Sequence, residues 1–203
     1  MAKLIGTYGH GTLNDFVLVP DLENNQKITP EQVRNICNRK TGIGADGLIR
    51  IAKTDGKWFM DYRNADGSVA EMCGNGIRVM ARYLVERGHQ PAGIFSILTR
   101  DGAKYLSVPE SGDISVNMGQ VQILDGEITA ANNGKVWSGY NVNVGNPHAV
   151  VFVESIGDVG DLIHPPVVRP KETFPEGVNV EFVEFLSNGE LQMRVHERGS
   201  GET

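Results

Sequence analysis

The residues Met72-Cys73-Gly74-Asn75-Gly76 lead directly into a run whose apolar positions follow helical spacing: Ile77, Met80, Ala81, Leu84 and Val85. Gly88 ends this run, so the pattern predicts a helix with Cys73 at its N-terminus. Unpaired N–H groups and the helix dipole favour an anion at that end of a helix. We therefore expect the Cys73 thiol to lose its proton more easily than a free thiol and to act as a base or nucleophile. The same N–H groups can hold a carboxylate beside the sulfur atom.

The composition is that of a globular protein without a polyanionic partner. The 203 residues can form one large domain or two small lobes, and 40% of them are hydrophobic. The net charge of −6 and a pI near 5.4 argue against a nucleic-acid partner. No apolar run is long enough to span a bilayer, and the first residues lack the apolar core of a signal peptide. We therefore expect a cytoplasmic enzyme or binding protein with no membrane partner.

The cysteines and histidines indicate neither a disulfide framework nor a metal site. Cys37 falls in a helix that begins at Thr29-Pro30, on the same face as Val33 and Ile36, and we expect it to be a small core residue. The sequence has no C-x-x-C or H-x-x-x-H pair, and its five His are scattered. We therefore expect no metal.

The pattern along the chain is many short strands around few helices. Strands are expected near 15–19, 48–52, 57–63, 94–99, 103–109, 113–118, 135–144, 148–154, 178–186 and 190–196. The polar stretch 125–135, rich in Gly and Asn, lies between these strands, and no strand is expected in it. This pattern predicts an α+β protein with mostly antiparallel strands, divided into lobes 1–118 and 119–203. An Asn precedes a strand in each half, at Asn14-Asp15-Phe16 and Asn146-Pro147-His148, which suggests two similar lobes.

The segment Gly42-Ile43-Gly44-Ala45-Asp46-Gly47 matches G-x-G-x-x-G but does not indicate a dinucleotide site. That motif follows a buried strand and opens a helix, whereas this segment follows a polar helix end and leads into a strand. We interpret it as a glycine-rich turn that carries the chain past a ligand or a neighbouring strand.

Several Asn residues stand beside Gly, Pro or strand ends: Asn14, Asn64, Asn75, Asn146 and Asn179. Each alone is typical of a turn. Taken alone, His148 is typical of a hydrogen-bonded structural His, and the pair Glu197-Arg198 of a solvated surface. Together with one activated Cys, the Asn residues could line a polar pocket for a zwitterionic small molecule.

The sequence closely resembles the diaminopimelate epimerase family. In the first half the resemblance rests on His10–Phe16, on the Gly42–Gly47 turn and on the block from Tyr62 through Gly76. In the second half it rests on Gly145-Asn146-Pro147-His148, Gly177-Val178-Asn179-Val180 and Glu197-Arg198-Gly199-Ser200-Gly201-Glu202-Thr203. These segments span the chain in the family's order. One small departure is Gly47, where some members of the family carry Gln.

The resemblance implies two pseudo-symmetric lobes, each with strands around a central helix. It implies that LL- and meso-diaminopimelate are interconverted without a cofactor, by a thiolate and a thiol on opposite faces of the α-carbon, in lysine and peptidoglycan synthesis. Cys73 is then one of two catalytic cysteines, and the N–H groups of Gly74 and Asn75 hold the α-carboxylate. His148 and Glu197 tune the thiols. The side chains that contact the substrate are Asn14, Asn64, Asn146, Asn179, Glu197 and Arg198. A homodimer is a further expectation.

One departure concerns the end of the sequence. In the family, a Gly-Ser-Gly-Glu-Thr segment leads into the second cysteine and its helix, whereas this sequence ends at Thr203. We therefore expect the 203 residues to belong to a longer protein, with the second lobe truncated before its central helix.

Three alternative functions stay open from the sequence. A proline-racemase-like or hydroxyproline-epimerase-like enzyme shares the lobes and the Cys, but typically has His where this sequence has Asn75. A non-catalytic amino-acid-binding module would use one lobe's carboxylate cradle without inversion. A thiol hydrolase would pair Cys73 with His148, but no separate acyl-pocket signature supports it.

Overall fold

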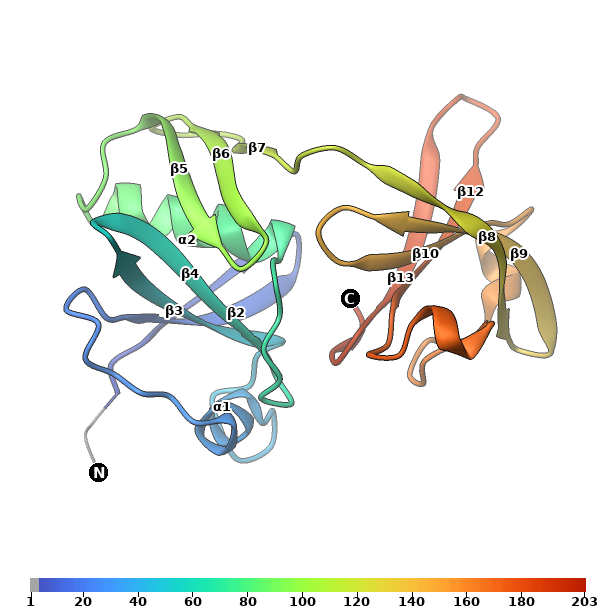
Figure 1. Cartoon of the computed structure of the whole chain (residues 1–203), viewed down its shortest axis with the longest axis horizontal. Helices are drawn as coiled ribbons and strands as arrows, with labels where there is room; N and C mark the ends of the chain where they lie inside the picture. The colour runs from blue at the N-terminus through green and yellow to red at the C-terminus, as the bar shows by residue number, and fades with distance from the viewer. Residues whose placement is uncertain (1–3) are drawn as a thin grey trace. The chain divides into compact units, whose positions relative to one another are not determined.

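The computed structural model describes residues 4–203, which divide into two compact units after Gly119 (Figure 1). Each unit is built on one seven-stranded sheet. The expectation of an α+β fold with mostly antiparallel strands is confirmed, since parallel pairing is confined to β2–β3 and β4–β5 in the first sheet and β10–β12 in the second.

The first sheet keeps the order of the sequence, β1-β2-β3-β4-β5-β6-β7. Its strands are β1 Thr7–Gly11, β2 Asn14–Pro20, β3 Gly47–Thr54, β4 Lys57–Asn64, β5 Gly93–Thr99, β6 Gly102–Val108 and β7 Ser115–Asn117. The sequence predicts all of them except β1, whose residues Thr-Tyr-Gly-His-Gly include two Gly and no apolar run.

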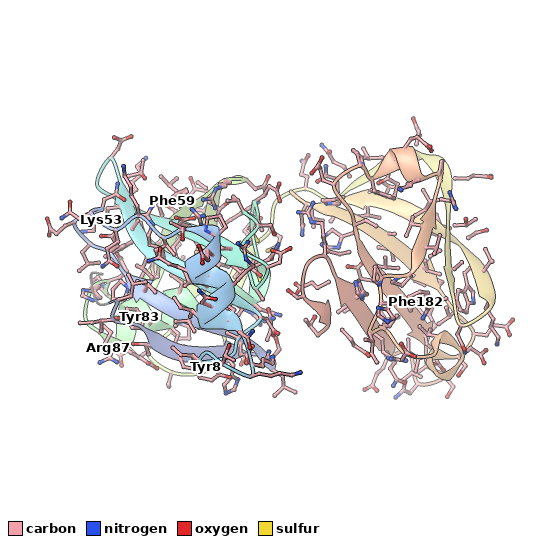
Figure 2. The ribbon with its side chains drawn as sticks, turned by 90° about the horizontal axis from the view of Figure 1, so that it is seen from below. Tyr8, Lys53, Phe59, Tyr83, Arg87 and Phe182 are labelled. Atoms are coloured by element: carbon pink, nitrogen blue, oxygen red, sulfur yellow. The ribbon has the colours of Figure 1, made fainter. Side chains whose placement is uncertain are left out.

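Helix α2 (Gly74–Glu86) packs on one face of the first sheet, as the apolar spacing predicts. At its C-terminal end the guanidinium of Arg87 lies 5.5 Å from the ring centroid of Tyr83 (Figure 2). Its fully buried side chains are Ile77, Met80, Ala81 and Leu84, and they share a core with Phe16, Leu18, Ile49, Ile51, Met60 and Tyr62 of the sheet.

Helix α1 (Pro30–Cys37) belongs to a second core on the opposite face of the first sheet. The predicted capping box is present, because Thr29 and Gln32 each accept a hydrogen bond from the other's backbone N–H. Cys37 is 3% exposed and packs with Val33 and Leu48. Burial raises the pKa of Cys37 to about 11, which confirms a packing role and makes this thiol a poor base.

The second sheet has the order β11-β8-β9-β10-β12-β13-β14. Its core contains Phe182 (Figure 2), and this ring packs edge-on against Trp137. The strands are β8 Gln122–Asn132, β9 Lys135–Asn143, β10 Pro147–Phe152, β11 Val167–Arg169, β12 Asn179–Phe185, β13 Leu191–Glu197 and β14 Gly201–Glu202. The helical segments of residues 120–203 are two short 3-10 helices, η1 Ile156–Val159 and η2 Lys171–Thr173.

The stretch 125–135, where the sequence predicts no strand, is largely part of β8. Strand β8 runs through it as far as Asn132, interrupted by a register shift between Leu124 and Ile128. The strand forms because Ile128 and Ala130 are buried in the core of the second sheet while their neighbours face outward. The bulge carries the polar residues that hide this alternation in the sequence.

The two sheets repeat one four-strand arrangement, β1-β2-β3-β4 in the first and β9-β10-β12-β13 in the second. In both, the successive pairs are antiparallel, parallel and antiparallel. The paired residues Phe16–Gly47 and His148–Asn179 are equivalent, as are Leu48–Arg63 and Val180–His196. The register therefore matches Asn14 with Asn146, Phe16 with His148, Gly47 with Asn179, and Asn64 with Glu197.

One face of the second sheet carries an exposed apolar strip. Phe152 and Phe185 stack with ring centroids 5.2 Å apart, and Phe185 is 67% exposed. Leu191 and Met193 of β13 are exposed beside them, while His196 of the same strand is buried. The register makes this face equivalent to the one that carries α2 in the first sheet, whereas Val159 of η1 packs into the core on the opposite face.

A buried carboxylate lies on the outer side of β4. Asp61 is 3% exposed and accepts hydrogen bonds from Arg50, Arg63 and Arg100. Burial alone would disfavour its charge, but the hydrogen bonds from Arg100, Arg50 and Arg63 hold the pKa of Asp61 below its usual value of 3.8. The native state therefore binds this proton less readily than the unfolded chain, so ionisation of Asp61 stabilises the fold.

We predict that this stabilisation is complete above about pH 4 and is lost as the pH falls through the lowered native pKa of Asp61. Urea unfolding between pH 6 and pH 2.5, followed by Trp58 fluorescence in a Trp137→Phe background, measures it. Asp61→Asn should unfold more easily at pH 6, and the difference from wild type should shrink toward pH 2.5. A difference independent of pH would contradict the prediction.

Candidate active site

Cys73 is the N-cap residue of α2, with φ −140° and ψ 118°. Its Sγ accepts a hydrogen bond from the N–H of Gly76 at 3.4 Å, and its carbonyl accepts one from Ile77 at 2.9 Å. The side chain is held in a buried position, because Cys73 is 7% exposed and belongs to the α2 core. The first helical residues, Gly74 and Asn75, carry N–H groups that an α-helix cannot pair internally, so they can receive a carboxylate.

Asn14 and Asn75 meet beside the Cys73 sulfur. The Oδ1 atom of Asn14 lies 3.7 Å from Cys73 Sγ and 3.5 Å from the Nδ2 atom of Asn75. Asn14 is 2% exposed and begins β2, directly after a turn in which Thr12 and Leu13 both have positive φ, 51° and 67°. Such a backbone is costly for Thr and Leu, and sites that retain it are often functional.

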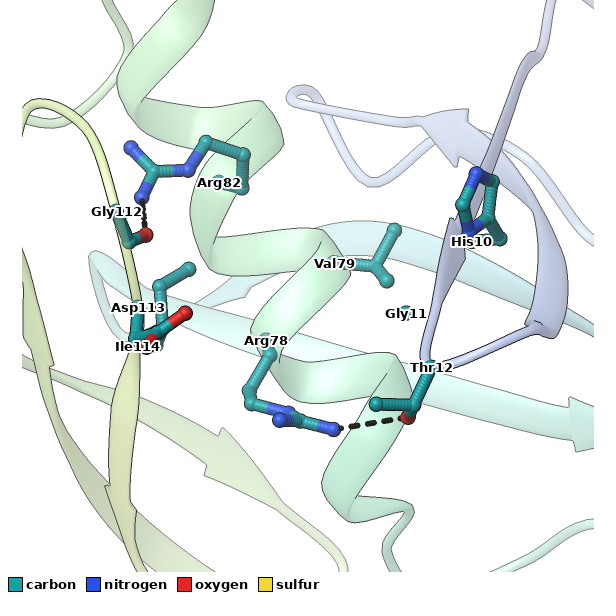
Figure 3. A pocket seen from close by; sticks show the side chains of 9 residues that line it. All are labelled: His10, Gly11, Thr12, Arg78, Val79, Arg82, Gly112, Asp113 and Ile114. Carbon is teal, nitrogen blue, oxygen red and sulfur yellow. Dashed lines mark hydrogen bonds between the residues drawn. The ribbon is translucent and has the colours of Figure 1, made fainter.

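Arg78 binds Asn75 and Thr12 on the solvent-exposed side of the Asn14–Asn75 pair. One of its guanidinium nitrogens donates to Asn75 Oδ1 and to Thr12 Oγ1, the latter at 3.2 Å (Figure 3). Arg78 and Thr12 line a hollow of about 330 Å³, together with His10, Gly11, Val79, Arg82, Gly112, Asp113 and Ile114. Arg82 donates to the carbonyl of Gly112 and so joins α2 to the far wall of this hollow (Figure 3).

Asn64 lies at the end of β4, opposite Gly47 of β3. It is 6% exposed, and its side chain donates to Ser68 Oγ at 3.0 Å. A Cβ at Gly47 would lie 2.6 Å from the ring of Tyr62 and 2.7 Å from the carbonyl oxygen of Arg63. The Tyr62 ring and the Arg63 carbonyl therefore leave no room for a side chain at Gly47.

In the second unit, the predicted residues gather at one end of β10, β12 and β13. His148 lies between two partners, with Nδ1 2.6 Å from Glu181 Oε1 and Nε2 2.8 Å from Asn146 Oδ1. Asn179 accepts a hydrogen bond from the backbone N–H of Arg198 at 2.8 Å. Glu197 is the last residue of β13, so Glu197 and Arg198 lie beside Asn179 at the end of the strand.

Glu181 is the residue of this group that the sequence reasoning missed. It is 8% exposed, and its Oε2 atom has no hydrogen-bond partner among residues 4–203. In the sequence, Glu181 is one polar position within the strand Asn179–Phe185, and nothing local distinguishes it from a surface residue. The available signal was register: His148 and Glu181 replace Phe16 and Ile49 of the first unit, so a hydrogen-bonded polar pair stands where the first sheet has two apolar core residues.

The sequence comparisons identify the family. The profile of the diaminopimelate epimerase family matches residues 6–124 and 140–203. This chain belongs to the diaminopimelate epimerase family. It is similar to the diaminopimelate epimerase of Streptomyces coelicolor, with 47% identity over 96% of this chain and 71% of the relative. It is also similar to that of Thermobifida fusca, with 44% identity over 96% of this chain and 76% of the relative.

Solved structures share the fold of this epimerase-family chain. A hydroxyproline epimerase from Agrobacterium vitis superposes with a TM-score of 0.67 at 15% identity, covering 97% of this chain and 71% of that one. A PhzF-family phenazine biosynthesis protein of Bacillus anthracis gives 0.61 at 14%, covering 98% and 74%. At such identities the likeness shows the architecture, and the family assignment rests on the epimerase relatives.

No helix in the described part of the chain is long and apolar enough to cross a membrane. Across residues 4–203, no three His, Cys, Asp or Glu side chains are grouped so that they could hold a metal ion.

We predict that Glu181 keeps a proton on Nδ1 of His148, because a carboxylate can only accept a hydrogen bond. Nitrogen-15 NMR of the imidazole at pH 8 should show Nδ1 protonated in the wild type and the proton redistributed to Nε2 in Glu181→Ala. Glu184→Ala is the matched control, since Glu184 accepts a hydrogen bond from the Ile156 backbone in the same unit and does not touch His148. An unprotonated Nδ1 in the wild type would refute the assignment.

Proposed function

We propose that this enzyme interconverts LL- and meso-diaminopimelate without a cofactor, with Cys73 as one of the two groups that exchange the α-proton. The observation that carries the proposal is the position of Cys73 at the N-terminus of α2, beside Asn14 and Asn75, in a chain of the diaminopimelate epimerase family. The product then serves lysine and peptidoglycan synthesis in the cytoplasm. A homodimer stays a prediction.

The chemistry requires a base on one face of the α-carbon and an acid on the other. Cys73 as a thiolate removes the α-proton from one stereoisomer, and as a thiol it returns a proton to the other. The carbanion formed between these steps is stabilised through the α-carboxylate, which the N–H groups of Gly74 and Asn75 bind at the positive end of α2. The low exposure of Cys73 keeps water from competing for the proton.

The remaining predicted residues bind substrate or adjust the acid–base groups. Asn14 and Asn64 in the first unit and Asn146 and Asn179 in the second offer amide groups to the ammonium and carboxylate ends of diaminopimelate. Arg198 suits the distal carboxylate because its planar fork can contact both oxygens. His148 and Glu197 tune the thiols.

Cys37 does not supply the second acid–base group. It packs between α1 and β3, and its raised pKa keeps it protonated near neutral pH. In the family pattern the second group is a cysteine that follows the Gly-Ser-Gly-Glu-Thr segment.

We predict that Cys73→Ala lowers inversion by at least about 100-fold while the fold is kept, because one of the two proton-transfer groups is lost. The measurement is separation of LL- and meso-diaminopimelate after incubation with each isomer. Cys37→Ala is the matched control and should keep its turnover while its urea midpoint falls, since it loses a packed side chain.

Inversion at the wild-type rate in a folded Cys73→Ala variant would refute the assignment. Binding of diaminopimelate without inversion by the intact wild type would instead favour the amino-acid-binding module. Inversion of proline or hydroxyproline in place of diaminopimelate would favour the proline-racemase-like alternative.

A further inference from the structure

We propose that Asp46, held by Arg39, is a positioning residue that fixes the side-chain amide of Asn14 with its oxygen toward Cys73. This assigns a role to the glycine-rich turn Gly42–Gly47, which the proposed function leaves unexplained. The proposal adds to that function, and its test needs only the Cys73 thiol.

The turn is shaped to fold back on the end of α1. The N–H of Gly42 donates to the Asn38 carbonyl at 2.8 Å, and the N–H of Ala45 donates to the Cys37 carbonyl at 3.1 Å. A Cβ at Gly42 would lie 2.1 Å from the Asn35 carbonyl oxygen. Gly44 has a φ of +81° and contacts Arg39. Only glycine allows these two close approaches, and they bring Asp46 to Arg39.

Both carboxylate oxygens of Asp46 are engaged. Oδ1 accepts from Arg39 Nη2 at 2.6 Å, and Oδ2 accepts from Asn14 Nδ2 at 2.8 Å and from the Asp15 N–H at 3.1 Å. Arg39 also holds Asp15 through two hydrogen bonds, and Tyr8 donates to Asp15 at 2.7 Å. Burial opposes the charge of Asp15, but the bonds from Arg39 and Tyr8 keep its pKa well below the usual range.

The amide of Asn14 has one donor end and one acceptor end. Since a carboxylate only accepts, Asp46 selects the Nδ2 end, and the Oδ1 end must then face Cys73 and Asn75. Rotating the amide by half a turn would set its oxygen against Oδ2 of Asp46. Asp46 therefore decides whether the thiol meets an acceptor or a donor.

Arg78 favours the same order from the opposite end. It donates to Asn75 Oδ1, which leaves the Nδ2 end of Asn75 facing Asn14. The result is a directed chain of hydrogen bonds from an anion to a cation, through Asp46, Asn14, Asn75 and Arg78. Each charge favours the same orientation of both amides.

This orientation has a defined effect on Cys73. The oxygen of Asn14 can accept the S–H proton and so favours the thiol, while the N–H of Gly76 favours the thiolate. Without Asp46, the amide of Asn14 can turn its N–H₂ end toward the sulfur, and both neighbours then favour the thiolate. The charged and titratable groups in this network are Asp46, Asp15, Arg39 and Tyr8 on one side of Asn14 and Arg78 on the side of Asn75.

The test is the pH dependence of Cys73 alkylation by iodoacetamide in the intact protein, with the modified peptide located by mass spectrometry. Asp46→Asn should move the midpoint down by about one pH unit, the size expected for one hydrogen bond to a charged group. Asp21→Asn is the matched control: it removes another buried carboxylate of the same unit, paired with Arg50 and not in contact with Asn14, and should leave the midpoint unchanged.

A change of charge alone could also move the midpoint, so each measurement is repeated in an Asn14→Ala background. If Asp46 acts through Asn14, the shift caused by Asp46→Asn disappears there. An equal shift in both backgrounds, or no shift in either, would overturn the proposal. Asp46→Ala provides a second variant if Asp46→Asn does not fold, with the same direction expected because the carboxylate that selects the Nδ2 end of Asn14 is again absent. Neither outcome depends on epimerase turnover.

Discussion

The close packing of α2 on the first sheet is the constraint on which the rest of the site depends. Glycines make it possible: a Cβ at Gly76 would lie 2.9 Å from Ile49, and Cβ atoms at Gly9 and Gly11 would lie 3.1 and 3.0 Å from Val79. Because the helix is held so closely by its core, its N-terminus cannot drift, and Cys73 is positioned by backbone geometry. The N–H groups that we propose to bind the α-carboxylate are fixed by the same packing.

The two units share one strand arrangement but carry different residue types at equivalent positions. In the first, the positions of Phe16 and Ile49 are apolar and build the platform beneath α2. In the second, the equivalent positions hold His148 and Glu181. Burying either polar side chain without a hydrogen bond would cost free energy, and the bond between them offsets part of that cost. The repeat thus places the Cys73 thiol at the N-terminus of a helix in one unit and the His148–Glu181 pair in the other.

Much of this could be read from local sequence. The capping box at Thr29, the N-cap cysteine and the alternation of Trp58, Met60 and Tyr62 all follow from short-range chemistry. The missed features depend on pairing between distant segments. Strand β1 has little side-chain signal, and β8 is hidden by a bulge. Glu181 and Asp46 gain their roles only when register and a folded-back turn bring them to His148 and Asn14. The roles of the site residues rest on family resemblance combined with this geometry.

The central claim is that a thiol pair exchanges the α-proton from opposite faces, with Cys73 on one of them. The most direct measurement is the position of deuterium after short incubation of the intact protein with LL- or meso-diaminopimelate in D₂O. Two bases predict that solvent deuterium appears first at the inverted carbon of the product, while recovered substrate keeps its α-proton. Deuterium entering substrate and product at equal rates would mean that one base serves both faces, and the account would be contradicted.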